Sequence, residues 1–248
     1  MNKDLYNQKD YEWWSNSAIQ SARRIVPILI KSFDFSSVVD FGCAQGGWLS
    51  VFQEQGIEEI QGIDGDWVNQ KELIIPELCF RCVDLSSYDH DPAEKYDLTL
   101  CLEVAEHMEE KFSDQLIDNL AKSSDIILFS AAVPDQGGQH HVNERPPEYW
   151  KEKFHARGFE QQDWLRPHLW GDQEIAWWYR QNIMLYLKGS SNKPVTNRRS
   201  GFGGAHLIHP TAFEEKNREL GLDNASLRNL CLEATKKAFN KLKKILSR

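Results

Sequence analysis

The stretch VVDFGCAQGGWLSVF, residues 38–52, joins a short apolar run to a second apolar segment through a glycine-rich turn. It predicts a β-strand carrying Asp40, a tight turn at Gly42, Gly46 and Gly47, and a helix that begins after the turn. Glycines allow positive φ and a close ligand approach, and the helix start offers free N–H groups. The spacing D-x-G-x-x-x-G differs from the dinucleotide fingerprint G-x-G-x-x-G. A carboxylate on the strand would repel a pyrophosphate and suits a cationic amino-acid group.

The rest of the first two-thirds of the chain predicts a parallel sheet. Short runs rich in Val, Ile and Leu are typical of buried strands, and they are SVVDF (37–41), EIQGID (59–64), FRCVDL (80–85), YDLTLCL (96–102) and DIILFSA (125–131). Strands that alternate with helices indicate a sheet covered on both faces. Two later runs, 160–165 and 182–187, are predicted to be edge strands that close the domain.

Helices are predicted before and between these runs. Residues 17–33 carry apolar side chains at helical spacing, although Pro27 is expected to kink or divide that helix. The segments 48–56, 65–78 and 107–123 are predicted to be helices or helix-bearing connections.

Composition limits the class of protein. The chain has 248 residues, 41% of them hydrophobic, so it can bury a substantial core. Its net charge of −8 argues against a general nucleic-acid binder. We see no apolar stretch of transmembrane length and no secretion signal. The five cysteines are scattered and odd in number, which is typical of reduced thiols, so a cytoplasmic location is predicted.

Three parts of the chain are predicted: a domain over residues 1–188, a flexible linker over 189–206 and a helical, basic tail over 207–248. The linker is small, polar and basic. The end of the tail carries an apolar stripe with positive charges opposite, formed by Leu232, Phe239, Leu242, Ile245 and Leu246 against Lys236, Lys237, Lys241, Lys243, Lys244 and Arg248. Such a helix suits docking on its own domain or on a second subunit, and an anionic membrane surface is the alternative.

Acidic residues also end the second and third predicted strands. Asp64 follows GI and can accept hydrogen bonds from ribose hydroxyls. Asp84 follows CV and can accept an adenine amino group, while Leu85 covers the ring. Ligands of open α/β sheets bind at the carboxyl ends of strands, so these positions converge on one crevice with Asp40.

In these motifs the sequence resembles the class I S-adenosylmethionine-dependent methyltransferases over residues 20–188. VVDFGCAQGG resembles their methionine motif, GIDGD the ribose motif, CVDL the adenine motif and YDLTLCLEVAEH the fourth-strand motif. The resemblance implies a Rossmann-like α/β fold with strand order 3-2-1-4-5-7-6 and S-adenosylmethionine as cofactor. The cofactor-binding residues it implies are Asp40, Gly42, Cys43, Gly46, Asp64, Asp84, Leu85 and Glu103. The usual family pattern is DxGCGxG, and this sequence departs from it at Ala44 and Gln45. The departure predicts a slightly different turn geometry.

The stretch CLEVAEHMEE, residues 101–110, places Glu103, Glu106 and His107 at i, i+3 and i+4. On a helix these side chains share one face. Carboxylates and imidazoles suit Mn²⁺ or Mg²⁺, and such an ion can hold a hydroxyl and lower its pKa. The segment resembles the E-x-x-E-H metal-binding segment of small-RNA 3′-terminal 2′-O-methyltransferases.

A loop rich in histidine follows the fifth predicted strand, at residues 135–150. We predict catalytic roles for His140, His141 and Glu144 there, because loops rarely bury such groups for packing. HHVNE resembles the later histidine segment of the same RNA enzymes. The resemblance makes His141 a fourth metal ligand beside Glu103, Glu106 and His107.

The acceptor is predicted less directly. The segments GGQHHVNERPPEYW, WWYRQNIMLYL and LIHPTAFE resemble a group of bacterial methyltransferases found beside glycan and natural-product assembly enzymes. Among nearby aromatic residues, Trp170 and Trp178 are predicted to face a sugar or another flat acceptor. The main hypothesis is O-methylation of a hydroxyl on a saccharide or saccharide-bearing small molecule, with help from a metal. Two alternatives stay open: metal-dependent 2′-O-methylation of an RNA 3′ end, and metal-free methylation with a His general base.

Overall fold

The computed structural model describes residues 8–189 and 206–219, and its central feature is one seven-stranded sheet. The strand order is β3-β2-β1-β4-β5-β7-β6, so the predicted order is confirmed. The strands are β1 (Ser37–Phe41), β2 (Glu59–Asp64), β3 (Phe80–Cys82), β4 (Leu98–Leu102), β5 (Ile126–Ser130), β6 (Phe159–Gln162) and β7 (Met184–Lys188). β1 and β2 begin and end at the predicted residues.

Strand direction decides where a site can form. β1 pairs in parallel with both β2 and β4, with Asp40 opposite Gly62 and Leu100. The carboxyl ends of these three strands therefore meet at one edge of the sheet. β7 runs antiparallel between β5 and β6, so the prediction that it is an edge strand was wrong. Its residues 184–187 are all buried, which is typical of an interior strand.

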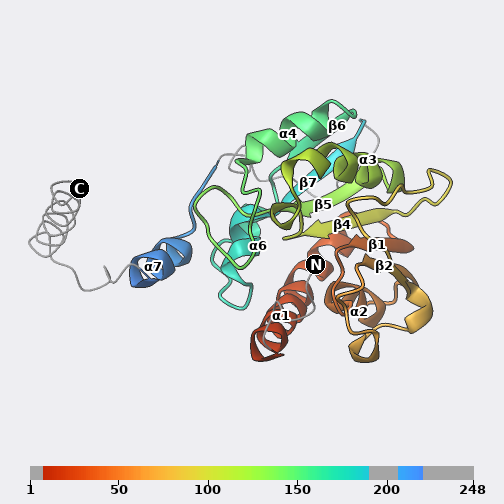
Figure 1. The fold of residues 1–248 in the computed structure, drawn as a ribbon, viewed down its shortest axis with the longest axis horizontal. Helices are drawn as coiled ribbons and strands as arrows, with labels where there is room; N and C mark the ends of the chain where they lie inside the picture. Colours follow the sequence, from red (N-terminus) through yellow and green to blue (C-terminus); the bar gives the residue numbers. More distant parts are fainter. Residues whose placement is uncertain (1–7, 190–205, 220–248) are drawn as a thin grey trace, which may run out of the picture. The chain divides into compact units, whose positions relative to one another are not determined.

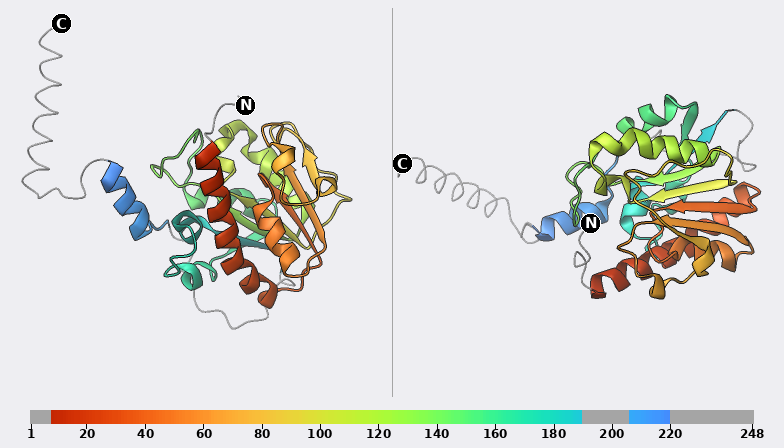
Figure 2. Two further views of the ribbon diagram at one scale, coloured as in Figure 1. Left: turned by 90° about the horizontal axis from the view of Figure 1, so that it is seen from below. Right: turned by 45° about the vertical axis from the view of Figure 1, so that its right-hand side comes forward.

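Helices cover both faces of the sheet (Figure 1 and Figure 2), with α1 and α2 on one face and α3 and α4 on the other. The helices are α1 (Gln8–Ser32), α2 (Gly47–Glu54), α3 (Ser113–Ser123), α4 (Pro147–His155), α5 (Arg166–Leu169), α6 (Trp177–Asn182) and α7 (Pro210–Glu219). Successive side chains of β1 point to opposite faces of the sheet. Val38 packs in the core with α1 and α2, and Val39 packs in the core with α3 and α4.

The helix predictions are confirmed in part. α1 runs unbroken from Gln8 to Ser32 with Pro27 inside it, so Pro27 does not divide the helix. Proline removes one backbone hydrogen bond, but Ile25, Val26 and Leu29 are fully buried around it, and this burial offsets the loss. The segment 65–78 is a helix-bearing connection, as predicted: it contains the single-turn 3₁₀ helices Gln70–Glu72 and Glu77–Cys79.

The chain divides into two compact units, residues 1–207 and 208–248, and each is described by itself. In the second unit the structure describes α7. The predicted amphipathic stripe and the basic charges between residues 232 and 248 lie outside the described residues, as does most of the predicted linker. Within the described part, no helix is both long enough and apolar enough to cross a membrane.

Candidate active site

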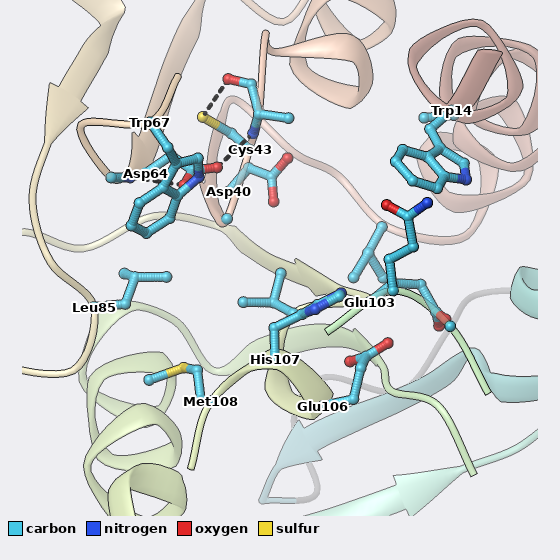
Figure 3. Close-up of a pocket in the computed structure, with 18 of the residues that line it drawn as sticks. Trp14, Asp40, Cys43, Asp64, Trp67, Leu85, Glu103, Glu106, His107 and Met108 are labelled. Carbon is cyan, nitrogen blue, oxygen red and sulfur yellow. Dashed lines mark hydrogen bonds between the residues drawn. The ribbon is translucent and has the colours of Figure 1, made fainter. Parts of the chain in front are cut away.

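A cavity of about 910 Å³ opens at the carboxyl ends of β1, β2 and β4. Figure 3 shows Asp40, Cys43 and Asp64 on one side of it and Glu106 and His107 on the other. Sites for small ligands and cofactors typically measure about 300–1,000 Å³. This volume is at the upper end of that range, which suits a cofactor together with a second ligand.

The glycine turn after β1 forms one wall of the cavity. Gly42 has φ +83°, and a Cβ there would lie 2.3 Å from Val104 Cγ2. Gly46 has φ +91°, and a Cβ would lie 2.8 Å from Ile75. Ala44 adopts φ +48°, a left-handed conformation that normally favours glycine. The turn therefore has a left-handed backbone conformation at Ala44, even though this residue carries a side chain.

Asp40 and Asp64 are buried behind this turn, at 3% and 4% exposure. Burial, together with the charge of Asp64, raises the pKa of Asp40 to about 7. Burial raises the pKa of Asp64 to about 6, although its carboxylate accepts the N–H groups of Ala44 and Gly65, each at 2.7 Å. A carboxylate has about four acceptor sites, so Asp64 also keeps capacity for a ligand.

The other predicted cofactor residues lie close by. Asp84 is exposed and lines the cavity, and hydrogen bonds from the hydroxyl and N–H of Ser86 lower its pKa. Leu85 and Cys43 are buried and line the cavity. Gly46 does not reach the lining, and its part is to allow the turn.

The E-x-x-E-H segment is not one helix face, so that expectation was wrong. Glu103 follows β4 with φ +56°, and its N–H donates to the Ser130 carbonyl at 3.0 Å. Glu106 and His107 lie on a separate 3₁₀ turn, Ala105–His107. The left-handed residue at the strand end turns the chain before any helix can include Glu103.

Glu106, His107 and His141 come together as candidate metal ligands. One donor atom from each lies within 4.8 Å of the other two. Glu106 is fully buried, and burial followed by the charge of Glu103 raises its pKa well above the usual range. Neither carboxylate oxygen has a partner in full hydrogen-bond geometry, although the backbone of Ala132 and the Glu103 side chain interact with the carboxyl group. Burial, followed by the charge of His141, lowers the pKa of His107 to about 4. A buried carboxylate without a partner is costly, and a divalent cation beside two imidazoles would satisfy it. These residues fit a metal; Glu103 is not part of the group.

Backbone hydrogen bonds bring His141 to this group. The N–H groups of Val142 and Asn143 donate to the carbonyl of Glu106 at 2.8 and 3.0 Å. The side chain of Asn143, which is buried, donates to the carbonyl of Ala105 at 3.4 Å. The histidine loop is therefore attached to the same turn that carries Glu106.

The two predicted catalytic histidines differ in position. His141 lines the cavity, and its Nδ1 lies 2.9 Å from Oε1 of Glu144. Glu144 does not line the cavity itself; it contacts the site through this interaction with His141. His140 is exposed with φ +61° and is not among the residues that line the cavity. The structure thus separates His140 from the other two.

Aromatic side chains form the wall beyond Glu103. Trp14 of α1 and Trp177, Trp178 and Tyr179 of α6 line the cavity. Trp178, predicted from the sequence, is among them, whereas Trp170 does not reach the lining. Sequence reasoning missed Trp14, although the pair WW at positions 13 and 14 was a visible signal.

The family follows from a comparison with known proteins. A family model described as a methyltransferase domain matches residues 14–182, a span that includes the glycine turn, the acids and the histidine loop. The chain is a class I S-adenosylmethionine-dependent methyltransferase. No curated protein matches this methyltransferase. The family implies S-adenosylmethionine as the cofactor.

Solved structures share the fold of this methyltransferase at low identity. The methyltransferase domain of bacterial CtHen1-C is 16% identical with TM-score 0.51, covering 70% of this chain and 100% of that one. Magnesium protoporphyrin IX methyltransferase from Synechocystis PCC 6803 is 15% identical with TM-score 0.51, covering 75% and 98%. Human N-acetylserotonin methyltransferase is 16% identical with TM-score 0.47, covering 68% of this chain, and the match spans about half (52%) of the human chain.

Proposed function

We propose that this methyltransferase methylates a hydroxyl of a saccharide or saccharide-bearing small molecule, with a divalent cation held by Glu106, His107 and His141. The observation that carries the proposal is the clustering of Glu106, His107 and His141, whose ligand atoms lie within 4.8 Å of one another, with the Glu106 carboxyl group fully buried. Burying this acid beside a second acid, Glu103, costs stability, and a bound cation would offset that cost.

The charge of the cavity supports a neutral acceptor. Its described lining contains no Lys or Arg and seven acidic residues, which are Asp40, Asp64, Asp66, Asp84, Glu103, Glu106 and Glu109. Phosphate-bearing acceptors such as RNA are normally met by Lys and Arg, so this lining favours a sugar over an RNA end. Carboxylates accept hydrogen bonds from sugar hydroxyls, and the aromatic wall of Trp14, Trp177 and Trp178 suits the apolar face of a ring.

The residues divide the work of an in-line methyl transfer. Asp40 and Glu103 favour the cationic amino-acid end of the cofactor. A bound divalent cation would supply a Lewis acid that lowers the pKa of the acceptor hydroxyl. The tryptophan wall holds the acceptor ring and excludes water, which keeps the hydroxyl oxygen in line with the methyl group. Glu144 fixes the ring of His141 by accepting its Nδ1–H, so that Nε2 carries the free lone pair.

The His141–Glu144 pair also favours a second candidate, methylation without a metal. In that reaction Nε2 of His141 would accept the hydroxyl proton as a general base, and Glu144 would stabilise the resulting imidazolium. Both candidates use the same ring nitrogen, so a metal-binding measurement separates them.

The test is calorimetric titration of Mn²⁺ into the metal-stripped protein, followed by methylation assays with labelled S-adenosylmethionine on neutral sugars and on RNA ends. We expect saturable Mn²⁺ binding that Glu106→Gln abolishes, and turnover that is lost in excess chelator and restored by Mn²⁺. Glu110→Gln is the control, since Glu110 is exposed and pairs with Arg145. Unchanged turnover in excess chelator would favour the metal-free candidate, and methylation of RNA alone would overturn the sugar acceptor.

A further inference from the structure

One buried amide group joins three elements behind the active site. Asn182 ends α6 and is 6% exposed. Its Nδ2 lies 3.2 and 3.4 Å from the two carboxylate oxygens of Glu103, and 3.0 Å from Oε1 of Gln136. Glu103 follows β4 and Gln136 lies in the loop after β5. Asn182 therefore links the helix that carries the tryptophan wall to both of these segments.

The surrounding hydrogen bonds fix which end of the Asn182 amide faces Glu103. Oε1 of Gln136 accepts the N–H of Val133 at 3.2 Å and Nε2 of Gln181 at 3.1 Å. The same Nε2 donates to Oδ1 of Asn182 at 3.1 Å. With Oδ1 used as an acceptor there, the NH₂ end of Asn182 must point at Glu103 and Gln136. A flipped amide would set oxygen against the carboxylate.

Glu103 depends on this partner for its position. Its backbone has the left-handed φ of +56°, which is strained for a residue with a side chain. Its N–H is held by the carbonyl and the hydroxyl of Ser130, at 3.0 and 3.2 Å. At the other end of the side chain, the neutral Asn182 amide donates to the carboxylate. Burial raises the pKa of Glu103, and the hydrogen bonds from Ser130 and Asn182 act against that rise, so they favour the charged form without cancelling its charge. A lysine or arginine at this position would have removed that charge from the site.

Glu103 and Asp40 line the same part of the cavity. β4, which Glu103 follows, pairs with β1, which carries Asp40, and both carboxylates line the cavity. The buried Tyr179 lies near both charges, and its hydroxyl accepts Nε1 of Trp48 at 3.4 Å. The two acids therefore flank the place where the cationic ammonium and sulfonium groups of S-adenosylmethionine would be attracted.

We propose that Asn182 is a positioning residue for cofactor recognition: it aims the carboxylate of Glu103 at the amino-acid half of S-adenosylmethionine. The inference uses the established cofactor and requires neither the proposed acceptor nor the proposed metal. Glu103 lies beside the proposed metal ligand Glu106, so both ligand affinities are measured on the metal-free protein. Because Asn182 acts through Glu103, its loss weakens only ligands that carry the amino-acid end.

The experiment measures the affinities of two ligands by calorimetry. S-adenosylhomocysteine carries the amino-acid end, whereas 5′-methylthioadenosine keeps the nucleoside and lacks it. For Asn182→Ala we expect about a tenfold loss of S-adenosylhomocysteine affinity, which is the size of one hydrogen bond to a charged group, and unchanged binding of 5′-methylthioadenosine. Glu103→Gln is expected to give a similar selective loss. The double variant is expected to lose no more than Glu103→Gln alone, since the two residues act as one unit.

Asn143→Ala is the matched control. Asn143 is also a buried asparagine, at 3% exposure, but its amide donates to the Ala105 carbonyl and the Ser113 hydroxyl and it does not line the cavity. Its loss is expected to lower stability and leave the ratio of the two affinities unchanged. If Asn182→Ala does not fold, Asn182→Ser, which keeps a polar group that is too short to reach Glu103, is measured instead.

Equal loss of both ligands, no loss of either, or additive effects in the double variant would overturn the proposal. Failure of the proposed metal-assisted function would be seen separately, in the Mn²⁺ titration, because neither ligand used here requires a metal or an acceptor.

Discussion

Nδ1 of His141 lies 2.9 Å from Oε1 of Glu144, and the same oxygen accepts the N–H of Gly137 at 2.7 Å. One carboxylate thus fixes both the ring of the histidine and the start of the loop that carries it. Gly138 lies between Gly137 and His141 in the sequence. Its lack of a side chain leaves space for the imidazole ring, since a Cβ there would lie 2.3 Å from Nε2 of His141. The position of Nε2 is therefore set by three residues of one loop.

Glu144→Gln is expected to weaken Mn²⁺ binding about 10- to 100-fold, the usual cost of losing the partner of a metal-ligating histidine. A glutamine side chain is neutral and can present either its oxygen or its NH₂ group to Nδ1. It therefore no longer fixes the tautomer in which Nδ1 of His141 carries the proton. Calorimetric titration of Mn²⁺ measures the effect. Glu160→Gln is the control, because Glu160 pairs with His155 on the surface at 3.3 Å, with both side chains exposed. Equal Mn²⁺ affinity in both variants would contradict the assigned role of Glu144.

Gly42→Ala is expected to abolish measurable S-adenosylhomocysteine binding. A Cβ at Gly42 combines a strained φ of +83° with a contact of 2.3 Å to Val104, so the turn must move. Overpacking of this kind costs about 1–3 kcal/mol. Gly56→Ala separates strain from contact, because Gly56 has φ +91° and nothing within 4 Å of the added Cβ.

Gly56→Ala is therefore expected to lower the free energy of unfolding by about 1–2 kcal/mol, the cost of a left-handed residue with a side chain, and to leave ligand binding intact. Denaturant unfolding and calorimetry measure the two effects. If Gly42→Ala binds the ligand as well as Gly56→Ala does, the ligand does not approach the backbone of this turn.

The fold could be predicted from the sequence because its signals are local. β1 was predicted to the residue, since SVVDF is an apolar run that ends at a glycine turn and all five of its residues are buried. The position of β7 followed from the family resemblance and not from a local signal. An apolar run indicates that a strand is buried. The place of β7 between β5 and β6 depends on pairing with residues more than 20 positions away in the sequence.

The candidate site was predictable only in part, for a related reason. Asp40, Asp64 and Asp84 were found because parallel strands bring their carboxyl ends together. Glu103 was placed on a shared helix face because spacing alone does not reveal the left-handed residue at the end of β4. Gln136 and Asn182 were missed altogether. Their amides matter through tertiary hydrogen bonds, and neutral amides at unremarkable spacing leave no sequence signal.

Asp64→Asn is expected to lower the free energy of unfolding by about 1–3 kcal/mol, the cost of a buried donor left unsatisfied. The two oxygens of Asp64 each accept one N–H, from Ala44 and from Gly65. An asparagine has one acceptor oxygen, so one of these N–H groups would face an NH₂ group. Denaturant unfolding gives the stability, and binding of S-adenosylhomocysteine is expected to weaken with it. A variant as stable as the wild type would show that these two bonds do not hold the turn.

The pH dependence of cofactor binding is expected to report Asp40. Its pKa is raised to about 7, first by burial and then by Asp64, so at pH 5.5 the carboxyl is mostly protonated and at pH 8 it is charged. The cofactor is cationic and favours the charged form, so its affinity rises as pH increases through 7. Calorimetry with S-adenosylmethionine from pH 5.5 to 8 measures this rise, and Asp40→Asn is expected to reduce it. The neutral 5′-methylthioadenosine is the control.

The stability of the ligand-free protein changes in the opposite direction. In the unfolded chain Asp40 loses its proton near its ordinary pKa of about 4, whereas the folded protein retains it up to about 7. The folded state therefore binds more protons in this window, and the free energy of unfolding falls as pH rises from about 4 to about 7. Asp40→Asn is expected to remove this part of the fall, as measured by urea unfolding at several pH values. A cofactor affinity that stays constant across pH 7 in the wild type would contradict the position of Asp40 beside the cationic ligand.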